Sequence, residues 1–263
     1  AAAGTVAWLI RCSQRRPLLL GAKTSQEERE KFRPVLAEVA RKFFFVCMDI
    51  AGVAKTVRIR IEENKVDITD EKLREQLVRQ CKVFERLAEI QSEVSSQHGI
   101  STEDLQELQQ THAGDEGIRG YVQGLNSMLD AALGGTMPIM PNVKIPAALG
   151  EDKVLKILSE AHGLETKKVL ERVGGTKMSV KDLGEVLNVA HRDAWDETMK
   201  AHAEKMRPGG PEVYHSTLAL YMRGDAFAER RRKIDEVQKQ RMLKIFRPPD
   251  AGLGSIPEGK AAG

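Results

Sequence analysis

Apolar residues recur at helical spacing along most of the chain. The longest such stripe runs from residue 27 to residue 54, where apolar side chains follow one another at intervals of three and four residues. Its members are Phe32, Leu36, Val39, Phe43, Cys47, Ile50 and Ala54. Because Phe44, Val46 and Val53 widen this stripe, we expect a helix that is buried on more than one side.

The period changes between residues 57 and 68. Val57, Ile59 and Ile61 alternate with charged residues and are followed by a polar segment, as in a small β-hairpin with a tight turn. The same residues also fit a continuation of the preceding helix with one charged face. The alternation favours the hairpin over the helix.

Further helices are predicted from the apolar spacing and from residues that cap or break helices. They cover 70–96, 101–110, 116–133, 151–161, 165–173, 182–206, 212–222 and 225–246. Gly163 is the expected break between two of them. Six apolar residues are expected to lie in the core: Phe43, Ile50, Leu77, Phe84, Tyr121 and Leu125.

Residues 134–150 divide the predicted helices into two groups. This segment carries three prolines among apolar residues, a composition typical of an extended connector. We therefore expect one helical subdomain over 27–133 and a second over 151–246. The basic head at 1–26 is expected to be a flexible or presequence-like segment, and the Gly- and Pro-rich tail at 247–263 is expected to be disordered.

Composition agrees with this picture. Aromatic residues make up only 5% of the 263 residues, which disfavours a β-sandwich or a barrel. The predicted fold is mainly α, with two helical subdomains of long amphipathic helices and at most one small β-hairpin near 57–68. Cys12, Cys47 and Cys81 are odd in number and far apart, which argues against a disulfide framework and favours a reducing compartment.

Charge is unevenly placed, although the net charge is only +3. Residues 1–26 hold four basic residues and no acid, in an Ala-, Ser- and Leu-containing context. This composition resembles an organellar targeting sequence, so we expect a mitochondrial or plastid location, with the cytoplasm as the alternative. The apolar segment at 37–54 is interrupted by charged residues, so no transmembrane span is predicted.

The predicted helix at 225–246 has the densest positive charge. Seven of its side chains are candidates for binding a partner or phosphate groups: Arg230, Arg231, Arg232, Lys233, Lys239, Arg241 and Lys244. Such side chains neutralise the phosphates of RNA or an anionic lipid surface, or they dock on an acidic protein. Ile234, Val237 and Leu243 are expected to form the buried stripe of this helix.

A solvated helix with internal ion pairs is the alternative for the same segment. Glu229 with Lys233 and Asp235 with Lys239 have the favourable order, with the acid four residues before the base.

Residues 120–126, Gly-Tyr-Val-Gln-Gly-Leu-Asn, resemble the YxQGMN signature of TBC domains, the Rab GTPase-activating family. In that family the matching glutamine orients the attacking water, and an upstream arginine stabilises charge on the transferring phosphoryl group. The resemblance thus implies this role for Gln123 and a GTPase partner. It covers seven residues, and the stretch at 115–119 lacks the arginine context of the family. The alternative is an amphipathic helix whose glycines permit close packing.

No other pattern indicates catalysis. The histidines contain no metal-binding pair, and His191 and His202 are expected to be solvated helix residues. We therefore predict no catalytic residue, no cofactor and no metal. The expected function is a non-enzymatic structural or accessory subunit of a larger, organellar assembly, with other protein subunits as partners. An RNA-binding, ribosome-associated helical protein and the Rab regulator are the alternatives.

Overall fold

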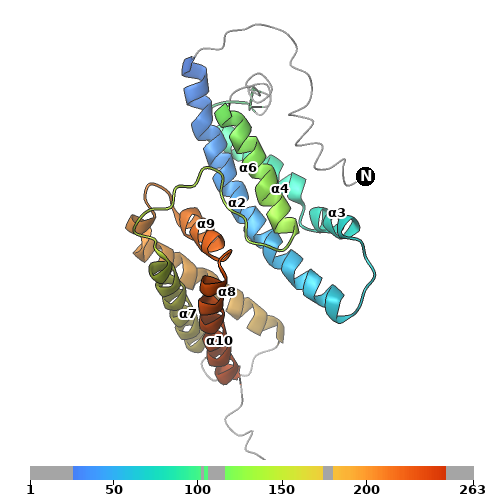
Figure 1. The fold of residues 1–263 in the computed structure, drawn as a ribbon, viewed down its shortest axis with the longest axis vertical. Coiled ribbons are helices and arrows are strands. Elements are labelled where there is room, and N and C mark those ends of the chain that lie inside the picture. Colours follow the sequence, from blue (N-terminus) through green and yellow to red (C-terminus); the bar gives the residue numbers. More distant parts are fainter. Residues whose placement is uncertain (1–25, 102–103, 106–115, 174–179, 247–263) are drawn as a thin grey trace, which may run out of the picture. The chain divides into compact units, whose positions relative to one another are not determined.

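The computed structural model describes residues 26–101, 104–105, 116–173 and 180–246 (Figure 1). Within these ranges every regular element is a helix, so the mainly α fold is confirmed. Contacts along the chain divide it into two units. The first comprises Ala1–Ala147 with Met206–Leu220, and the second comprises Ala148–Lys205 with Tyr221–Gly263.

Helix α2 (Gln26–Glu63) is the central helix of the first unit. It continues through the segment where a hairpin was expected, and that expectation is wrong. Val57 and Ile61 are four residues apart and both pack against the core, whereas Ile59 between them is 46% exposed. The apparent alternation is therefore a helical face with one outward-facing isoleucine.

A left-handed residue ends α2. Lys65 has a φ of 51°, and the Val66 amide donates to the Ile61 carbonyl at 3.0 Å. This is the hydrogen bond of a Schellman cap, which satisfies a carbonyl that the helix itself leaves unpaired.

The single helix predicted over 70–96 is two helices, α3 (Asp70–Gln80) and α4 (Val83–Gln97). They meet at Lys82, which adopts a left-handed conformation with φ 48° and ψ 47°. The break shifts the helical phase, so that Val83 is fully buried while its neighbour Phe84 is half-buried. The one-helix prediction is wrong because the left-handed turn at Lys82 ends α3 and starts α4 in a new helical phase.

Helix α6 (Glu116–Leu133) packs along α2, and α4 packs on another part of the same helix (Figure 1). Of the six predicted core residues, four are buried: Phe43, Ile50, Leu77 and Leu125. Tyr121 and Phe84 are half-buried, so the prediction was too strong for these two. The widening of the α2 stripe is confirmed at Phe44 and Val46, which are buried, but is wrong at Val53, which is 42% exposed.

The connector at 134–150 has no regular secondary structure, as predicted. Met140 packs against the core of the first unit, and its amide donates to the Ser216 hydroxyl of α9 (Pro211–Tyr221) at 3.0 Å. The connector is thus held by side-chain and backbone contacts within the first unit.

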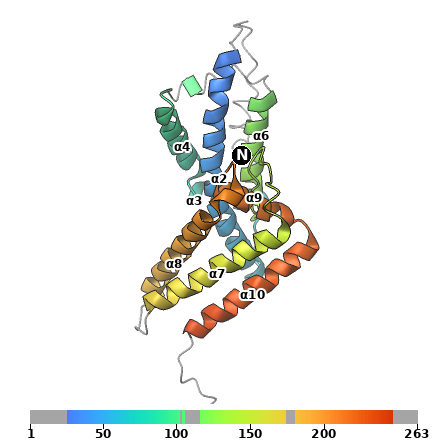
Figure 2. The ribbon, with the colours of Figure 1, turned by 90° about the vertical axis from the view of Figure 1, so that its left-hand side faces the viewer.

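The second unit contains α7 (Glu151–Val173), α8 (Val180–Ala201), the 3₁₀ turn η1 (Ala203–Met206), whose last residue belongs to the first unit, and α10 (Asp225–Phe246). Helix α7 packs against both α8 and α10 and lies between them (Figure 2).

Helix α7 runs through Gly163, so the predicted break there is wrong. A glycine inside a helix costs only about 1 kcal/mol. Buried residues before and after it, such as Leu158 and Val169, keep the helix in place.

Several expectations fall outside the described residues. They include residues 1–25 of the head, the tail at 247–263 and most of the helix predicted at 101–110. At the start of that helix, Ser101 and Asp104 exchange backbone-to-side-chain hydrogen bonds of 2.9 and 3.2 Å, which is a capping box. The two subdomain ranges stay a prediction, because contacts within a chain do not test whether a segment folds alone.

Candidate interaction surface

Helix α10 packs on α7 through a side that is partly polar. Phe227 and Gln238 are buried. The Thr166 hydroxyl of α7 lies 3.0 Å from Gln238 Oε1, and Gln238 Nε2 donates to Glu165 Oε2 at 3.3 Å. Because a buried amide must find partners, these hydrogen bonds set the position of α10 on α7.

The expected buried stripe of α10 is only partly correct. Ile234 is half-buried, but Val237 is 50% exposed and Leu243 is 44% exposed. The helix is rotated so that Phe227 and Gln238, rather than Val237 and Leu243, face α7. Two apolar side chains are therefore left among the charges of the outer surface.

Arg230 forms ion pairs within the second unit. Its guanidinium forms ion pairs with Glu151 and Asp152 in the first turn of α7, at 3.6 Å to Glu151 and at shorter range to Asp152. This contact joins the beginning of α10 to the beginning of α7, so Arg230 is a structural residue as well as a surface cation.

Four other candidate residues pair with acids of α10 itself. Arg231 pairs with Asp235 at 3.3 Å, Arg232 with Glu229 at 2.6 Å, Lys233 with Glu229 at 3.9 Å and Lys239 with Glu236 at 3.9 Å. The expected pair of Glu229 with Lys233 is present, whereas Asp235 pairs with Arg231 rather than with Lys239. Exposed pairs of this kind contribute about 0–1 kcal/mol each, so they leave the cations available to a partner.

Arg241 and Lys244 are exposed and form no ion pair with any described residue. They follow Lys233 and Val237 at intervals of four, four and three residues, which places all four on one side of the helix. We call Lys233, Val237, Arg241 and Lys244 the basic stripe. Among the acids of α10, Glu229 reaches this side at its beginning, where it pairs with Lys233. The stripe thus combines positive charge with one exposed apolar side chain.

A second polar cluster lies beside the first half of α7. His202 is 9% exposed; its Nε2 lies 2.5 Å from Glu160 Oε2, and its Nδ1 lies 2.9 Å from Lys205 Nζ. The hydrogen bond from His202 holds the pKa of Glu160 below its usual value. The expectation of a solvated histidine is wrong for His202, because α7 covers it, but right for the exposed His191.

Sequence reasoning missed this cluster. Lys153, Lys156 and Glu160 follow one another at helical spacing on α7, and His202 and Lys205 are three residues apart. That spacing was visible, but nothing in it shows that the two segments meet.

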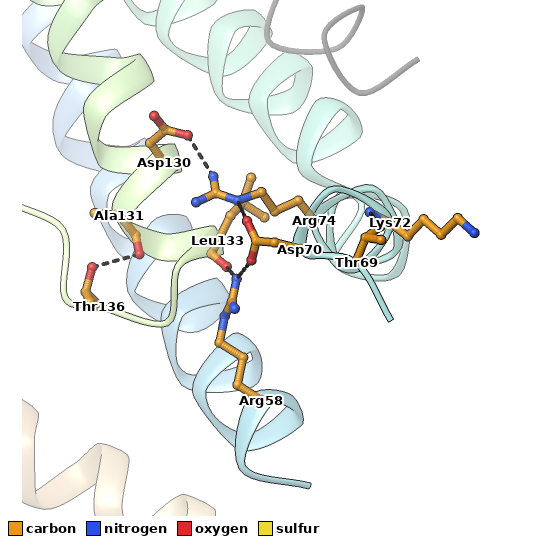
Figure 3. A network of polar contacts seen from close by, with 9 residues as sticks. All are labelled: Arg58, Thr69, Asp70, Lys72, Arg74, Asp130, Ala131, Leu133 and Thr136. Atoms are coloured by element: carbon orange, nitrogen blue, oxygen red, sulfur yellow. Dashed lines mark hydrogen bonds and ion pairs between the residues drawn. The ribbon is translucent and has the colours of Figure 1, made fainter. Parts of the chain in front are cut away.

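A third network joins three helices of the first unit (Figure 3). Arg58 of α2 donates to Asp70 at 2.6 Å and to the Leu133 carbonyl at the end of α6, at 3.0 Å. Arg74 donates to Asp70 at 2.7 Å and to Asp130 of α6 at 2.9 Å. The hydrogen bonds from Arg58 and Arg74 lower the pKa of Asp70. Since both guanidinium groups bind carboxylates or a carbonyl of neighbouring helices, the network is structural, although Arg58 Nε is buried without a hydrogen-bond partner.

The short signature at 120–126 lies on α6. The Gln123 side chain is exposed, and the backbone carbonyl of Gln123 accepts a hydrogen bond from the Ser127 hydroxyl at 3.0 Å. Gly124 lies against Pro141 of the connector, so it permits the close packing that the alternative interpretation of this segment expects.

Among the described residues, no three His, Cys, Asp or Glu side chains gather as metal ligands. None of the described helices combines the length and the apolar composition that crossing a bilayer requires.

Comparisons with known proteins give no match: no family model, no curated protein and no solved structure is similar to the chain. The resemblance to the Rab GTPase-activating signature therefore depends on its seven residues alone.

Proposed function

We propose that this protein is a non-enzymatic helical subunit that joins a larger assembly through the basic stripe of α10. The observation that carries the proposal is the side of α10 where Arg241 and Lys244 have no acidic partner among the described residues and Val237 is half exposed. Charge complementarity points to an acidic protein surface as the partner.

The pairing of the other cations supports this choice of surface. Arg230 is committed to α7, and Arg232 and Lys239 lie next to glutamates on the opposite side of α10. Arg241 and Lys244, which have no acidic partner among the described residues, therefore lie together on the other side. Val237 adds methyl groups, and a docked protein would gain free energy by removing them from water. A helix that faces only solvent gains nothing from an exposed valine.

An RNA partner is the alternative for the same stripe. Phosphate contacts require cations but gain little from Val237, so the two partners differ in what they need from the helix. The apolar residue within the stripe favours the protein.

The organellar location belongs to this proposal as well. It rests on the acid-free, Arg-containing composition of residues 1–26. A fluorescent fusion of the full chain is expected to accumulate in a mitochondrion or plastid, and replacing Arg11, Arg15 and Arg16 with Gln is expected to disperse it. An unchanged distribution of the variant would refute this part of the proposal.

The test of the interface is co-purification of the tagged full chain from its native source. The stripe variant carries Lys233→Gln, Arg241→Gln and Lys244→Gln. The control carries Lys167→Gln, Arg232→Gln and Lys239→Gln, which removes the same number of charges at other exposed sites. Glutamine keeps the helix propensity of both proteins.

We expect a stoichiometric protein partner with the wild type and the control, and a loss of at least about tenfold with the stripe variant, which corresponds to about 1.4 kcal/mol. Val237→Ala is expected to weaken the association as well. Release of the bound material by nuclease identifies RNA as the partner instead. A chain that purifies alone, or a stripe variant that retains its partner, contradicts the proposal.

A further inference from the structure

Lys205 lies beside a histidine that a carboxylate orients. Lys205 Nζ lies 2.9 Å from His202 Nδ1, and His202 Nε2 lies 2.5 Å from Glu160 Oε2. All three residues belong to the second unit, with Glu160 on α7 and Lys205 in η1. A nucleophile next to a base, with the base held by a third group, is the arrangement by which proteins activate nucleophiles.

The partners of the imidazole decide its tautomer. An ammonium nitrogen has no free lone pair, so Lys205 donates and His202 Nδ1 accepts. The ring proton of the neutral imidazole then lies on Nε2 and is donated to Glu160, whose pKa this hydrogen bond lowers. His202 therefore presents a lone pair to the lysine, and Glu160 stabilises the imidazolium that forms when this lone pair takes up a proton.

The cluster combines a covered base with a more accessible nucleophile. His202 is buried, whereas Lys205 is half-buried, so part of the lysine side chain is open to solvent. Other charged groups act on the cluster from α7. After the hydrogen bond from His202, the charges of Lys156, which lies 4.0 Å from the carboxylate, and of Lys153 also lower the pKa of Glu160. Glu160 thus stays ionised and available to His202.

We propose that Lys205 is a site of acylation by thioesters, with His202 as its general base. The Lys205 ammonium loses one proton to solvent, and the free amine attacks the carbonyl carbon of the thioester. His202 Nδ1 takes a proton from the nitrogen of the tetrahedral intermediate. The carbon–sulfur bond then breaks, and the leaving thiolate receives that proton from His202. The products are the amide of Lys205 and a free thiol.

The leaving group explains the choice of acyl donor. A thiol has an ordinary pKa of about 8.5, so a thiolate leaves readily, and the step depends on removing a proton from the attacking nitrogen. His202 is placed to do this, which favours thioesters over oxygen esters. The acyl group stays on the lysine, so the step is stoichiometric. Lys205 lies outside the basic stripe, and the proposal does not depend on the function proposed above.

The test is the acetylation rate of each lysine of the full chain with S-acetyl-N-acetylcysteamine, a small uncharged thioester, followed by peptide mass spectrometry. Lys200 is the internal reference, because it is exposed on α8 and forms no ion pair with a described residue. Lys205 is expected to react at least about tenfold faster than Lys200 at about pH 8, since a placed general base contributes roughly 10²–10⁴-fold.

His202→Gln is expected to slow the reaction of Lys205 at least about tenfold and to leave Lys200 unchanged. Glu160→Gln keeps an acceptor for His202 Nε2 but removes the negative charge, so a smaller loss is expected. The matched control is His191→Gln, which replaces an exposed histidine of α8 and is expected to keep the wild-type rate at Lys205. Circular dichroism checks that each variant is folded.

The pH dependence of the wild-type chain needs no variant. Both lysines react as free amines, but only Lys205 also needs a neutral imidazole, because protonated His202 cannot accept. The ratio of the Lys205 rate to the Lys200 rate is therefore expected to fall from about pH 8 to about pH 5, where imidazole gains its proton. A Lys205 rate no higher than that of Lys200, a ratio that stays constant with pH, or an unchanged rate in His202→Gln would overturn the proposal.

Discussion

Gly124 of α6 lies directly against the ring of Pro141. A Cβ added to Gly124 would lie 2.7 Å from Pro141 Cγ and closer still to Pro141 Cβ. Cβ atoms essentially never come this close to another heavy atom, so glycine is required at this position for steric reasons. The contact holds the connector against α6 within the first unit.

Gly124→Ala is therefore expected to destabilise the protein by about 1–3 kcal/mol, because the added methyl group must displace the proline ring or the helix. Urea unfolding followed by circular dichroism measures the change.

Gly120→Ala is the matched control, one turn earlier on the same helix. Nothing lies within 4 Å of the Cβ it would add, so it is expected to stabilise the protein by about 0.5–1 kcal/mol. Destabilisation by both substitutions, or by neither, would contradict the packing described for α6.

Asp70 gives the first unit a pH-dependent stability. Its pKa is lowered from 3.8 by the hydrogen bonds from Arg58 and Arg74. A lowered folded-state pKa means that the stabilisation is fully present above pH 3.8 and is lost as the pH falls through the folded-state pKa. Because the side chain of Asp70 is 56% exposed, water screens the interaction, and we expect only about 0.5–1 kcal/mol.

Asp70→Asn is expected to lower the free energy of unfolding by that amount at about pH 7, with a difference that shrinks below pH 3.8. Asp67→Asn serves as the control, since Asp67 is exposed and pairs with no described residue. A difference between Asp70→Asn and wild type that persists unchanged in acid would show that the charge of Asp70 is not the cause.

The break at Lys82 predicts which side chains of α4 stabilise the core. Leu87 is 2% exposed, whereas Phe84 is half-buried. Leu87→Ala is expected to cost about 2–5 kcal/mol and Phe84→Ala distinctly less, although phenylalanine is the larger residue. Unfolding curves of both variants give the comparison. A larger loss of stability for Phe84→Ala would contradict the break at Lys82 and support the unbroken helix that the spacing alone indicates.

Cys47 and Cys81 are expected to differ in reactivity. Burial raises the pKa of the Cys47 thiol to about 12, and it also raises the pKa of the half-buried Cys81 thiol. The thiolate is the reactive form, and Cys47 is in addition fully covered. Iodoacetamide labelling of the native protein at about pH 8, read by peptide mass spectrometry, should modify Cys81 well before Cys47. Equal rates in the native protein would contradict the burial of α2.

Helical spacing was enough to predict the bounds of α6 and α10, but it ended α2 too early and divided α7 at Gly163. The bounds of α10, Asp225–Phe246, follow from an acidic first residue after Gly224 and from the prolines after residue 247. The turn at Lys82 has no such signal, because neither glycine nor proline marks it. Its left-handed conformation is stabilised by the packing of α3 and α4, which only the folded chain provides.

The sequence showed the charge of the candidate surface, but it did not show which of its cations are paired. Charge density along the chain singled out α10, but it did not distinguish Arg230, which pairs with α7, from Arg241, which has no described partner. That difference depends on how α10 is rotated on α7, and the contact of Gln238 with Thr166 decides it. The burial of His202 is likewise a consequence of helix packing and not of local sequence.

Lysine footprinting of the natively purified assembly tests the proposed interface most directly. The rate of acetylation of each lysine is compared between the assembly and the isolated chain by mass spectrometry. We predict that Lys233 and Lys244 are protected in the assembly, because they lie within the basic stripe. Lys239, on the opposite side of the same helix and paired with Glu236, should react at the same rate in both samples. Unchanged rates at Lys233 and Lys244, or equal protection of all three lysines, would contradict the claim that α10 docks through this stripe.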